Sequence, residues 1–318
     1  MTGARGAAAA GAAPGSTTDP PLVNLREVAE IELFIMKRMK EFTLGDHHSI
    51  FKGAGFNFVG TRDWAPGDRM SAIDWAQSSL TNFSPLVTRE FEQPSQATIV
   101  AVADASLSTR CGVGGDVIAV AIARAVAAAG LSALFFQDLF GLVTFDGHFE
   151  QLAAARPRIG RSHVLYCLDL YQERKALEVP RGGRDVILAI ESQLRKASLV
   201  PVISDFLFPD APRIIKELSL LNAVHDVFLL MADAQFAYQL PDVSDGWVEI
   251  LDVESGETRV LSRRELGRLS TRVGEWQDDI ARLARDADLD VVRVGLDRWA
   301  METALVSLTA ERRLRKMQ

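Results

Sequence analysis

Short apolar runs and longer amphipathic segments alternate along the last two thirds of the chain. Val, Ile and Leu dominate four of these runs, and turn residues bound them, which is typical of buried β-strands. These predicted strands are 98–103, 199–204, 225–231 and 289–294. Apolar residues at helical spacing predict helices at 116–129, 161–174, 185–197, 264–286 and 299–314. Strands that alternate with helices favour an α/β fold, with a doubly wound, mostly parallel sheet and helices on both faces.

Two predicted hairpins complete this pattern. Residues 139–146 and 149–153 flank the dipeptide Asp146-Gly147, which is a strong turn signal. A second hairpin pairs 247–252 with 258–261. Residues 130–136 fit either a continuation of the preceding helix or a strand.

The first third of the chain has a different pattern. Residues 1–21 are rich in Ala and Gly, which predicts a disordered tail. Apolar residues at helical spacing predict a helix over 24–42, with Asn24 as its N-cap. Glycines interrupt short aromatic and β-branched pieces over 51–91, which indicates bent strands and tight turns. We therefore expect three parts: a tail at 1–21, a helix with a small β-rich α+β subdomain at 22–96, and an α/β domain at 97–318.

Charged and aromatic residues gather in the β-rich segment: Arg62, Asp63, Trp64, Asp68, Asp74 and Trp75. The opposite charges favour ion pairs that hold a small subdomain together, and the tryptophans would form its core or its contact with the main domain. We favour this structural role over a catalytic one, because structural ion-pair networks also create unusual charge environments.

Composition narrows the possible settings. Hydrophobic residues make up 48% of 318, enough for a substantial core. The net charge is −7 and the basic residues are interspersed with acidic ones, which argues against nucleic-acid binding. The two cysteines lack metal-ligand spacing and fit a reducing compartment. No apolar stretch is expected to reach the roughly 18–20 residues that cross a bilayer, so we expect a cytoplasmic protein without a membrane span.

Oxygen-bearing side chains follow the first predicted buried strand. Asp104 ends that strand, and Ser106 and Ser108 follow at every second position. In open α/β sheets ligands bind beyond the carboxyl ends of the strands, and a carboxylate with two hydroxyls suits Mg²⁺, Mn²⁺ or Ca²⁺. The alternative is that these residues cap the next helix. Because Asp104 lies at a strand end, we expect its replacement by Ala to cost little stability.

Two further predicted strands also end on carboxylates. Asp205 follows the strand at 199–204, and Asp233 follows the strand at 225–231. Three carboxylates at one edge of the sheet are costly unless a positive charge neutralises them. This pattern favours a bound cation, although Asp is also common as a helix N-cap in such loops.

Two motifs of the chain resemble known families. Residues 104–108 have the D-x-S-x-S form of the metal-ion-dependent adhesion site of von Willebrand factor A domains, and Asp205 resembles the later aspartate of that site. The stretch GTRDWAPGD at 60–68, followed by IDW at 73–75, resembles the signature of domain-of-unknown-function family 58. That family places this segment just upstream of a von Willebrand factor A-like domain. The resemblance covers residues 50–318 and implies that fold.

The resemblance also implies a role for each matching residue. Ser106 and Ser108 would ligate Mg²⁺ or Mn²⁺ through their hydroxyls, and Asp104 and Asp205 would do so directly or through water. The family's site also uses a Thr from an intervening loop. This chain has Gly182-Gly183-Arg184-Asp185 where that Thr is expected, and Arg184 would bring a positive charge there instead. Metal binding and a decayed site therefore both stay open.

The resemblance implies a non-enzymatic protein-interaction module. In such domains the metal keeps an open coordination position for a carboxylate of a partner protein. Family members resemble proteins encoded beside MoxR-type AAA+ ATPases, which are thought to act as chaperones in assembling or activating other complexes. The implied partners are thus a MoxR-type ATPase and its client complex. The chain has no phosphate-binding loop of its own.

Two other functions remain open from the sequence. One is a Mg²⁺-dependent hydrolase or phosphotransferase in which Asp104 is the nucleophile and Asp205 and Asp233 hold the metal. Such enzymes commonly have a carboxylate two residues after the nucleophile, where this chain has Ser106. The other is a purely structural domain whose metal site has decayed.

Overall fold

The computed structural model describes most of the chain, namely residues 21–44, 57–65, 70, 73–92, 96–113, 116–173, 185–194, 196–238, 247–251 and 258–295. The predicted helix at 299–314 and nearly all of the predicted tail lie outside these residues, as do Asp68 and Arg184. The predicted domain boundaries stay predictions.

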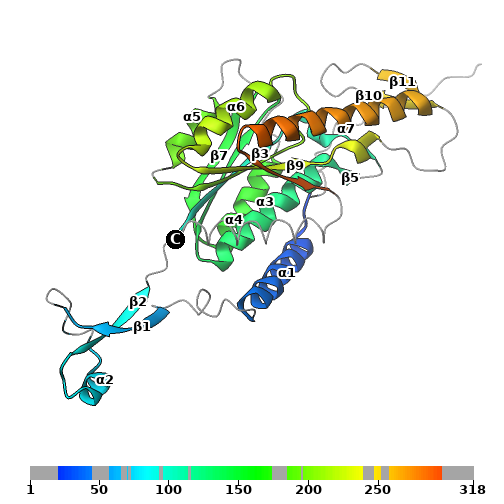
Figure 1. Ribbon diagram of the computed structural model, residues 1–318. Helices are drawn as coiled ribbons and strands as arrows, with labels where there is room; N and C mark the ends of the chain where they lie inside the picture. Colours follow the sequence, from blue (N-terminus) through cyan, green and yellow to red (C-terminus); the bar gives the residue numbers. More distant parts are fainter. Residues whose placement is uncertain are drawn as a thin grey trace, which may run out of the picture.

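A six-stranded sheet forms the centre of the molecule (Figure 1). Its strands are β3 (Thr98–Asp104), β6 (Leu139–Phe145), β7 (Gln151–Arg158), β8 (Leu199–Ser204), β9 (Asp226–Ala232) and β12 (Asp290–Val294). Their order is β12-β9-β8-β3-β6-β7, and every neighbouring pair is parallel except β6 and β7. The predicted α/β fold with a mostly parallel sheet is confirmed, and β3 lies inside it between β8 and β6.

Helices cover both faces of this sheet (Figure 1). One face packs against α3 (Ile118–Phe135) and α4 (Arg161–Gln172), and α1 (Leu25–Leu44) packs on the outside of α3. The other packs against α5 (Val186–Gln193), α6 (Ala211–Asn222) and α7 (Arg263–Asp286). Successive residues of β3 alternate between the two cores, because side chains of a strand point to opposite faces in turn. Buried on both faces, β3 therefore consists almost entirely of small and branched apolar residues.

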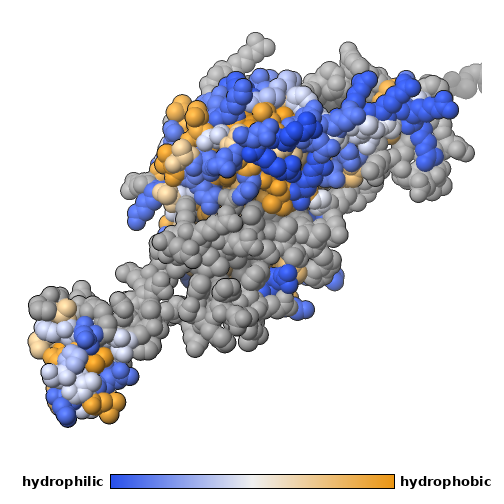
Figure 2. All heavy atoms as spheres, in the orientation of Figure 1, coloured by the Kyte–Doolittle hydropathy of each residue, from blue (hydrophilic) through white to orange (hydrophobic). Residues whose placement is uncertain are grey.

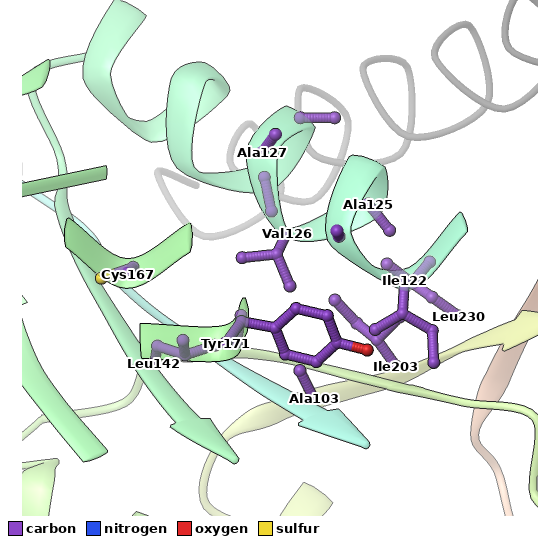
Figure 3. Packing of buried hydrophobic residues seen from close by; sticks show 14 of the residues in the cluster. Ala103, Ile122, Ala125, Val126, Ala127, Leu142, Cys167, Tyr171, Ile203 and Leu230 are labelled. Carbon is purple, nitrogen blue, oxygen red and sulfur yellow. The ribbon is translucent and has the colours of Figure 1, made fainter. Parts of the chain in front are cut away.

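The central helix α3 packs closely on the sheet. It continues through the segment 130–136 that the sequence left ambiguous, as far as Phe135. A Cβ atom at Gly130 would lie 2.8 Å from Val164 Cγ1 and 3.0 Å from Phe140 Cε1, so only glycine fits this contact between α3, α4 and β6. In the core close-up of Figure 3, Val126 lies over the ring of Tyr171, with Ala103 of β3 beyond it.

Among the described residues, α3 is also a helix long and apolar enough to cross a membrane. The expectation that no stretch reaches such a length is therefore wrong. In the folded protein, however, 83% of this 18-residue segment is buried. Its composition reflects a core helix that is apolar nearly all the way round, since sheet and helices surround it.

The N-terminal helix α1 packs on α3 and α4 through one apolar stripe. Asn24 caps it as predicted, because its Oδ1 accepts a hydrogen bond from Glu27 N at 2.9 Å. Val28, Ile31 and Ile35 recur at helical spacing and are buried in the core. A partly buried ion pair between Glu27 and Arg124 of α3, at 2.6 Å, fixes the start of the helix.

A small unit lies between α1 and β3 in the sequence. It consists of β1 (Asn57–Asp63), the short helix α2 (Trp75–Leu80) and β2 (Val87–Glu92). The strands β1 and β2 pair antiparallel, with a register shift between Phe58 and Gly60, in the segment where the glycine-rich pattern predicted bent strands. Asp74 caps α2 by accepting hydrogen bonds from Ala76 N and Gln77 N. The buried Ser78 hydroxyl accepts a hydrogen bond from Val87 N at 2.9 Å, which joins α2 to β2.

The remaining elements are short or lie at the margins of the sheet. They are the 3₁₀ helices at Leu107–Arg110 and Gln235–Tyr238, the two-residue strands β4 (Gly112–Val113) and β5 (Asp116–Val117), and the predicted hairpin of β10 (Trp247–Leu251) and β11 (Thr258–Ser262). The strand β7 borders the sheet and contains Pro157, with exposed arginines at 156 and 158.

Candidate functional site

A cavity of about 560 Å³ opens beyond the carboxyl ends of β3, β6 and β8. Residues from the loops after all three strands line it, including Ser106, Ser108, Asp146 and Phe208. This is where an open α/β sheet binds ligands. The loop after β3 that carries the predicted motif therefore borders the cavity.

Asp104 lies behind this cavity, fully buried at the end of β3. Its Oδ1 accepts a hydrogen bond from Ser106 N at 2.9 Å, and its Oδ2 accepts one from Ser204 Oγ at 2.6 Å. The Tyr171 hydroxyl donates to its backbone oxygen at 2.9 Å. Burial raises the pKa of the Asp104 carboxyl and the nearby Asp146 charge adds to that rise, while the hydrogen bonds from Ser106 and Ser204 lower the pKa.

The hydroxyls of Ser106 and Ser108 face each other at the cavity wall, with their Oγ atoms 3.0 Å apart. Neither caps the next α-helix: α3 begins after Val117, and the short 3₁₀ helix that follows Ser106 receives no side-chain cap from it. The capping alternative therefore does not account for the two serines. The Ser106 backbone is held in place, because the buried Thr109 hydroxyl donates to its carbonyl at 2.7 Å.

Asp205 is buried at the end of β8, next to the Ser204 that holds Asp104. Its Oδ1 accepts a hydrogen bond from Leu207 N at 3.0 Å. Its carbonyl accepts one from the buried Gln277 of α7 at 2.9 Å. Asp205 is not among the residues that line the cavity, so it stands behind the wall, as Asp104 does.

Asp233 does not join this group. It follows β9, which is two strands away from β3 in the sheet, and its Oδ1 accepts a hydrogen bond from Gln235 N in its own turn. The three strand-end carboxylates thus lie at the same edge of the sheet, as expected, but Asp233 is not among the residues that line the cavity. In the parts of the chain that the structure describes, no three Asp, Glu, His or Cys side chains are grouped so as to hold a metal ion.

Asp146 lies next to Asp104 on the other side of β3, and we did not predict it as a site residue. It follows β6, whose Phe145 pairs with Asp104, and it is buried and lines the cavity. Its Oδ1 accepts hydrogen bonds from His148 N and Glu150 N, which form the predicted turn. From the sequence, Asp146 was predicted only as a turn residue. It directly follows an apolar run, which is the same signal that identified Asp104 as a candidate site residue.

A cation of the chain also borders the cavity. Arg110 follows the two serines, and its guanidinium lies 5.8 Å from the centre of the Tyr171 ring. Its Nη2 donates a hydrogen bond to the Tyr171 carbonyl at 3.5 Å. The residues that line the cavity thus include the two serines, the Arg110 guanidinium and three acidic residues, together with apolar side chains such as Leu207; the acidic residues are Asp146, Glu173 and Asp210.

The donor set fits a hard divalent cation held mainly through hydroxyls. Two ligands at adjacent corners of an octahedron lie about 3.0 Å apart when each is about 2.1 Å from Mg²⁺. The Ser106 and Ser108 oxygens have this separation. Because Asp104 Oδ2 already accepts a hydrogen bond from Ser204, that carboxylate would act through water or balance the charge from behind.

The residues of the upstream signature lie in the small unit. Asp74 is buried and acts as the cap of α2, while Trp75 is exposed and is not part of a core. Asp63 ends β1, and Trp64 follows it, partly buried. The side chain of Arg62 lies outside the described residues, as does the whole of Asp68.

Comparison with protein families gives a match over most of the chain. The family described as "Protein of unknown function DUF58" matches residues 60–273, from β1 into α7. The chain belongs to the DUF58 family.

This DUF58 protein is similar to proteins of mycobacteria. It is 26% identical over 311 residues to "Uncharacterized protein Rv1480" of Mycobacterium tuberculosis, covering 94% of this chain and 92% of that protein. "Uncharacterized protein Mb1516" of Mycobacterium bovis matches with the same identity and coverage.

Two solved structures resemble the DUF58 protein more distantly. The conserved hypothetical protein BatB from Bacteroides thetaiotaomicron has a TM-score of 0.41 and 16% identity, over 68% of this chain and 98% of BatB. An aerotolerance-related membrane protein from Bacteroides fragilis has a TM-score of 0.39 and 14% identity, over 66% of this chain and 96% of that protein.

These neighbours contradict two of our expectations. We predicted a cytoplasmic location, and we predicted a MoxR-type ATPase and its client as partners, with no membrane span. One of the two neighbours is named as a membrane protein, which disagrees with the cytoplasmic location and the absence of a membrane span that we expected. Both expectations are corrected accordingly, and neither neighbour identifies a partner.

Proposed function

We propose that this DUF58 protein is a non-enzymatic interaction module of the von Willebrand factor A type. In this proposal its cavity binds Mg²⁺ or Mn²⁺ and, with it, an acidic side chain of a partner protein. The observation that carries the proposal is the pair of serine hydroxyls, 3.0 Å apart, on the wall of an open cavity at the end of a buried strand. Hydroxyl and carboxylate oxygens are the ligands that these hard cations prefer.

Two groups of residues would form the cation site, one at the cavity wall and one buried behind it. Ser106 and Ser108 would supply the direct ligands at the cavity wall. Asp104, buried behind them, holds the loop by accepting from Ser106 N and places a carboxylate near the cation. A bound divalent cation would supply an electrophilic position for the partner's carboxylate, which would complete its coordination.

The cavity wall also suits an acidic partner residue on an apolar background. Arg110 borders the cavity and brings a positive charge, which attracts a carboxylate, and the bound cation would offset the acidic residues Asp146, Glu173 and Asp210 of the same wall. Leu207 and Phe208 provide apolar surface next to the polar groups. Specific contacts of this kind combine a few polar anchors with apolar area.

The enzymatic alternative has less support from the geometry. Asp104 is fully buried, does not line the cavity, and its two oxygens already accept hydrogen bonds from Ser106 N and Ser204 Oγ. A nucleophilic carboxylate needs direct access to the substrate. We therefore retain the interaction module as the proposed function.

Calorimetric titration of the purified chain with MgCl₂ and MnCl₂ tests the site. We expect saturable binding that is lost in Ser108→Ala, because one of the two direct ligands is removed. Ser192→Ala is the matched control, since Ser192 lies on α5 and its hydroxyl donates only to Ala189 O. No heat and no thermal shift with either metal would favour a decayed site and would overturn the proposal.

A second measurement tests the binding of acidic groups. A short peptide with one aspartate among apolar residues should bind the wild-type chain in Mg²⁺ but not in EDTA. The same peptide with asparagine in place of the aspartate should not bind. Equal binding of the two peptides would show that no carboxylate completes the site.

A further inference from the structure

A second concave surface lies between α5 and α6, on one helical face of the sheet. It is a groove of about 440 Å³. From α5 it is lined by Leu188 and Glu191, and from α6 by Glu217 and Leu220. These positions recur at helical spacing, so one stripe of each helix faces the groove. No function described above uses it.

Three of the apolar residues that line this groove are open to solvent. The exposed fraction is 59% for Leu188, 76% for Leu220 and 66% for Val224. Figure 2 shows hydrophobic side chains on the part of the surface where Figure 1 places α5 and α6. Large apolar side chains clustered at a groove mark an interaction site more often than scattered ones do.

Acidic side chains border the same groove. Asp185 lies at the start of α5, Glu191 lies near its end, and Glu217 faces them from α6. Glu217 pairs with Arg213 one turn away, whereas Glu191 makes no ion pair with any residue that the structure describes. Among the described residues that line the groove, His225 is the one that can become positively charged. The border is therefore predominantly negative at neutral pH.

We propose that this groove binds a basic amphipathic helix of a partner protein. The apolar ridge of that helix would pack between α5 and α6 against Leu188, Leu220 and Val224, as helices pack into grooves between two others. Its Lys or Arg residues would face Asp185, Glu191 and Glu217. The acidic border disfavours an anionic lipid surface, because like charges repel there. The proposal is independent of the cation site.

The test is a fluorescence-anisotropy titration of the full chain with a labelled 18-residue peptide. The peptide carries Leu at positions i, i+3, i+4 and i+7 of successive turns and Lys elsewhere; a second peptide has Glu in place of every Lys. We expect saturable binding of the Lys peptide only. Leu220→Ser and Glu191→Lys should each weaken it about tenfold, as expected for the loss of an interface anchor or of a paired charge.

Two control variants make the same chemical changes elsewhere. Leu33→Ser removes an exposed leucine of α1, on the other face of the sheet, and Asp279→Lys reverses an exposed charge on α7 outside the groove. We expect both controls to bind the Lys peptide as the wild type does.

Four results would overturn the proposal. They are no binding of the Lys peptide, equal binding by Leu220→Ser, equal weakening by Asp279→Lys, and equal binding of the Glu peptide. Light scattering and flotation with anionic phosphatidylserine vesicles complete the test. A dimer, or vesicle binding, that Leu220→Ser abolishes would assign the groove to a second copy or to lipid and would also overturn it.

Discussion

At the scale of single residues, Ser204 holds two parts of the candidate site together. Its hydroxyl donates to Asp104 Oδ2 at 2.6 Å and accepts from Phe206 N at 2.8 Å. Phe206 has a φ of +54°, in the left-handed region that a bulky side chain rarely adopts. The Ser204 hydroxyl therefore stabilises both the buried Asp104 carboxylate and the strained backbone of Phe206. A change at any of these three residues should affect the other two.

We predict that Asp104→Ala lowers the free energy of unfolding by about 2–3 kcal/mol, because it leaves the Ser204 hydroxyl and Ser106 N without their buried acceptor. The expectation of a small cost assumed that a strand-end residue lies outside the core, whereas Asp104 is fully buried. Urea denaturation in EDTA measures the effect. Asp104→Asn keeps the shape and one acceptor, so it should cost less; a loss below about 0.5 kcal/mol in Asp104→Ala would contradict the prediction.

The pH dependence of stability should carry the signature of the same residue. Burial raises the Asp104 pKa above the ordinary 3.8, so the folded state keeps this proton at pH values where the unfolded state has released it. Its contribution is therefore most favourable below pH 3.8 and is lost as the pH rises through the raised pKa. The difference between wild type and Asp104→Asn, followed in EDTA from acid to neutral pH, should show this fall. A difference independent of pH would contradict it.

The sequence predicted part of the site at this scale. The alternation of Asp104, Ser106 and Ser108 after an apolar run identified the loop that borders the cavity. It could not show that Asp104 is buried while the serines face the cavity, because the side-chain directions depend on Ser204 and Tyr171, which are distant in sequence. It also could not show that Asp233 stays outside the cavity lining, because strand order, which the sequence does not give, puts β9 two strands away from β3.

At the scale of elements, α7 connects the ends of two parallel strands. The Gln277 side chain donates to the carbonyls of Asp205 after β8, at 2.9 Å, and of Ala232 in β9, at 2.8 Å. The neighbouring Trp276 donates to the Phe206 carbonyl at 2.8 Å. Buried carbonyls need a hydrogen-bond donor. The helix α7 supplies donors to three carbonyls that lie at or just beyond the ends of β8 and β9.

We predict that Gln277→Leu lowers the free energy of unfolding by about 2–3 kcal/mol, because two buried carbonyls lose their donor. Trp276→Phe removes a single hydrogen bond of the same kind and should cost about 1 kcal/mol beyond its change in packing. Chemical denaturation of both variants measures the difference. A Gln277→Leu variant as stable as the wild type would show that water replaces the side chain.

The elements were more predictable than the site. Long helices with clear signals were assigned closely, such as α7, which begins with a capping box formed by Ser262 and Glu265. The helix α6 was not assigned, although Pro212 in its first turn and apolar residues at helical spacing mark it. The helix α2 has six residues, too few for a periodic pattern to develop.

At the scale of the whole molecule, the described residues form units of very different size. The α/β unit has six strands with helices on both faces, whereas β1, β2 and α2 form a two-stranded hairpin with one short helix. Figure 1 draws this small unit apart from the sheet. Hairpins of two strands have little buried area and are marginally stable, so stability should be distributed unevenly along the chain.

We predict that amides of β1 and β2 exchange with solvent at least about a hundredfold faster than those of β3 and β8, as expected where opening is local. Hydrogen exchange followed by mass spectrometry measures this. Ser78→Ala should accelerate exchange in β2 further, since its hydroxyl holds Val87 N, and should leave β3 unchanged. Equal protection of β2 and β3 would show that the small unit unfolds together with the sheet.

The makeup of β7 limits how these molecules can associate. Pro157 lies against Gly141 of β6, where the register of the pair shifts, and Arg156 and Arg158 beside it are charged and exposed. Proline and arginine at such a position discourage the lateral joining of sheets that begins aggregation. At high concentration, the protein is therefore protected from forming fibres by edge-to-edge pairing of β7.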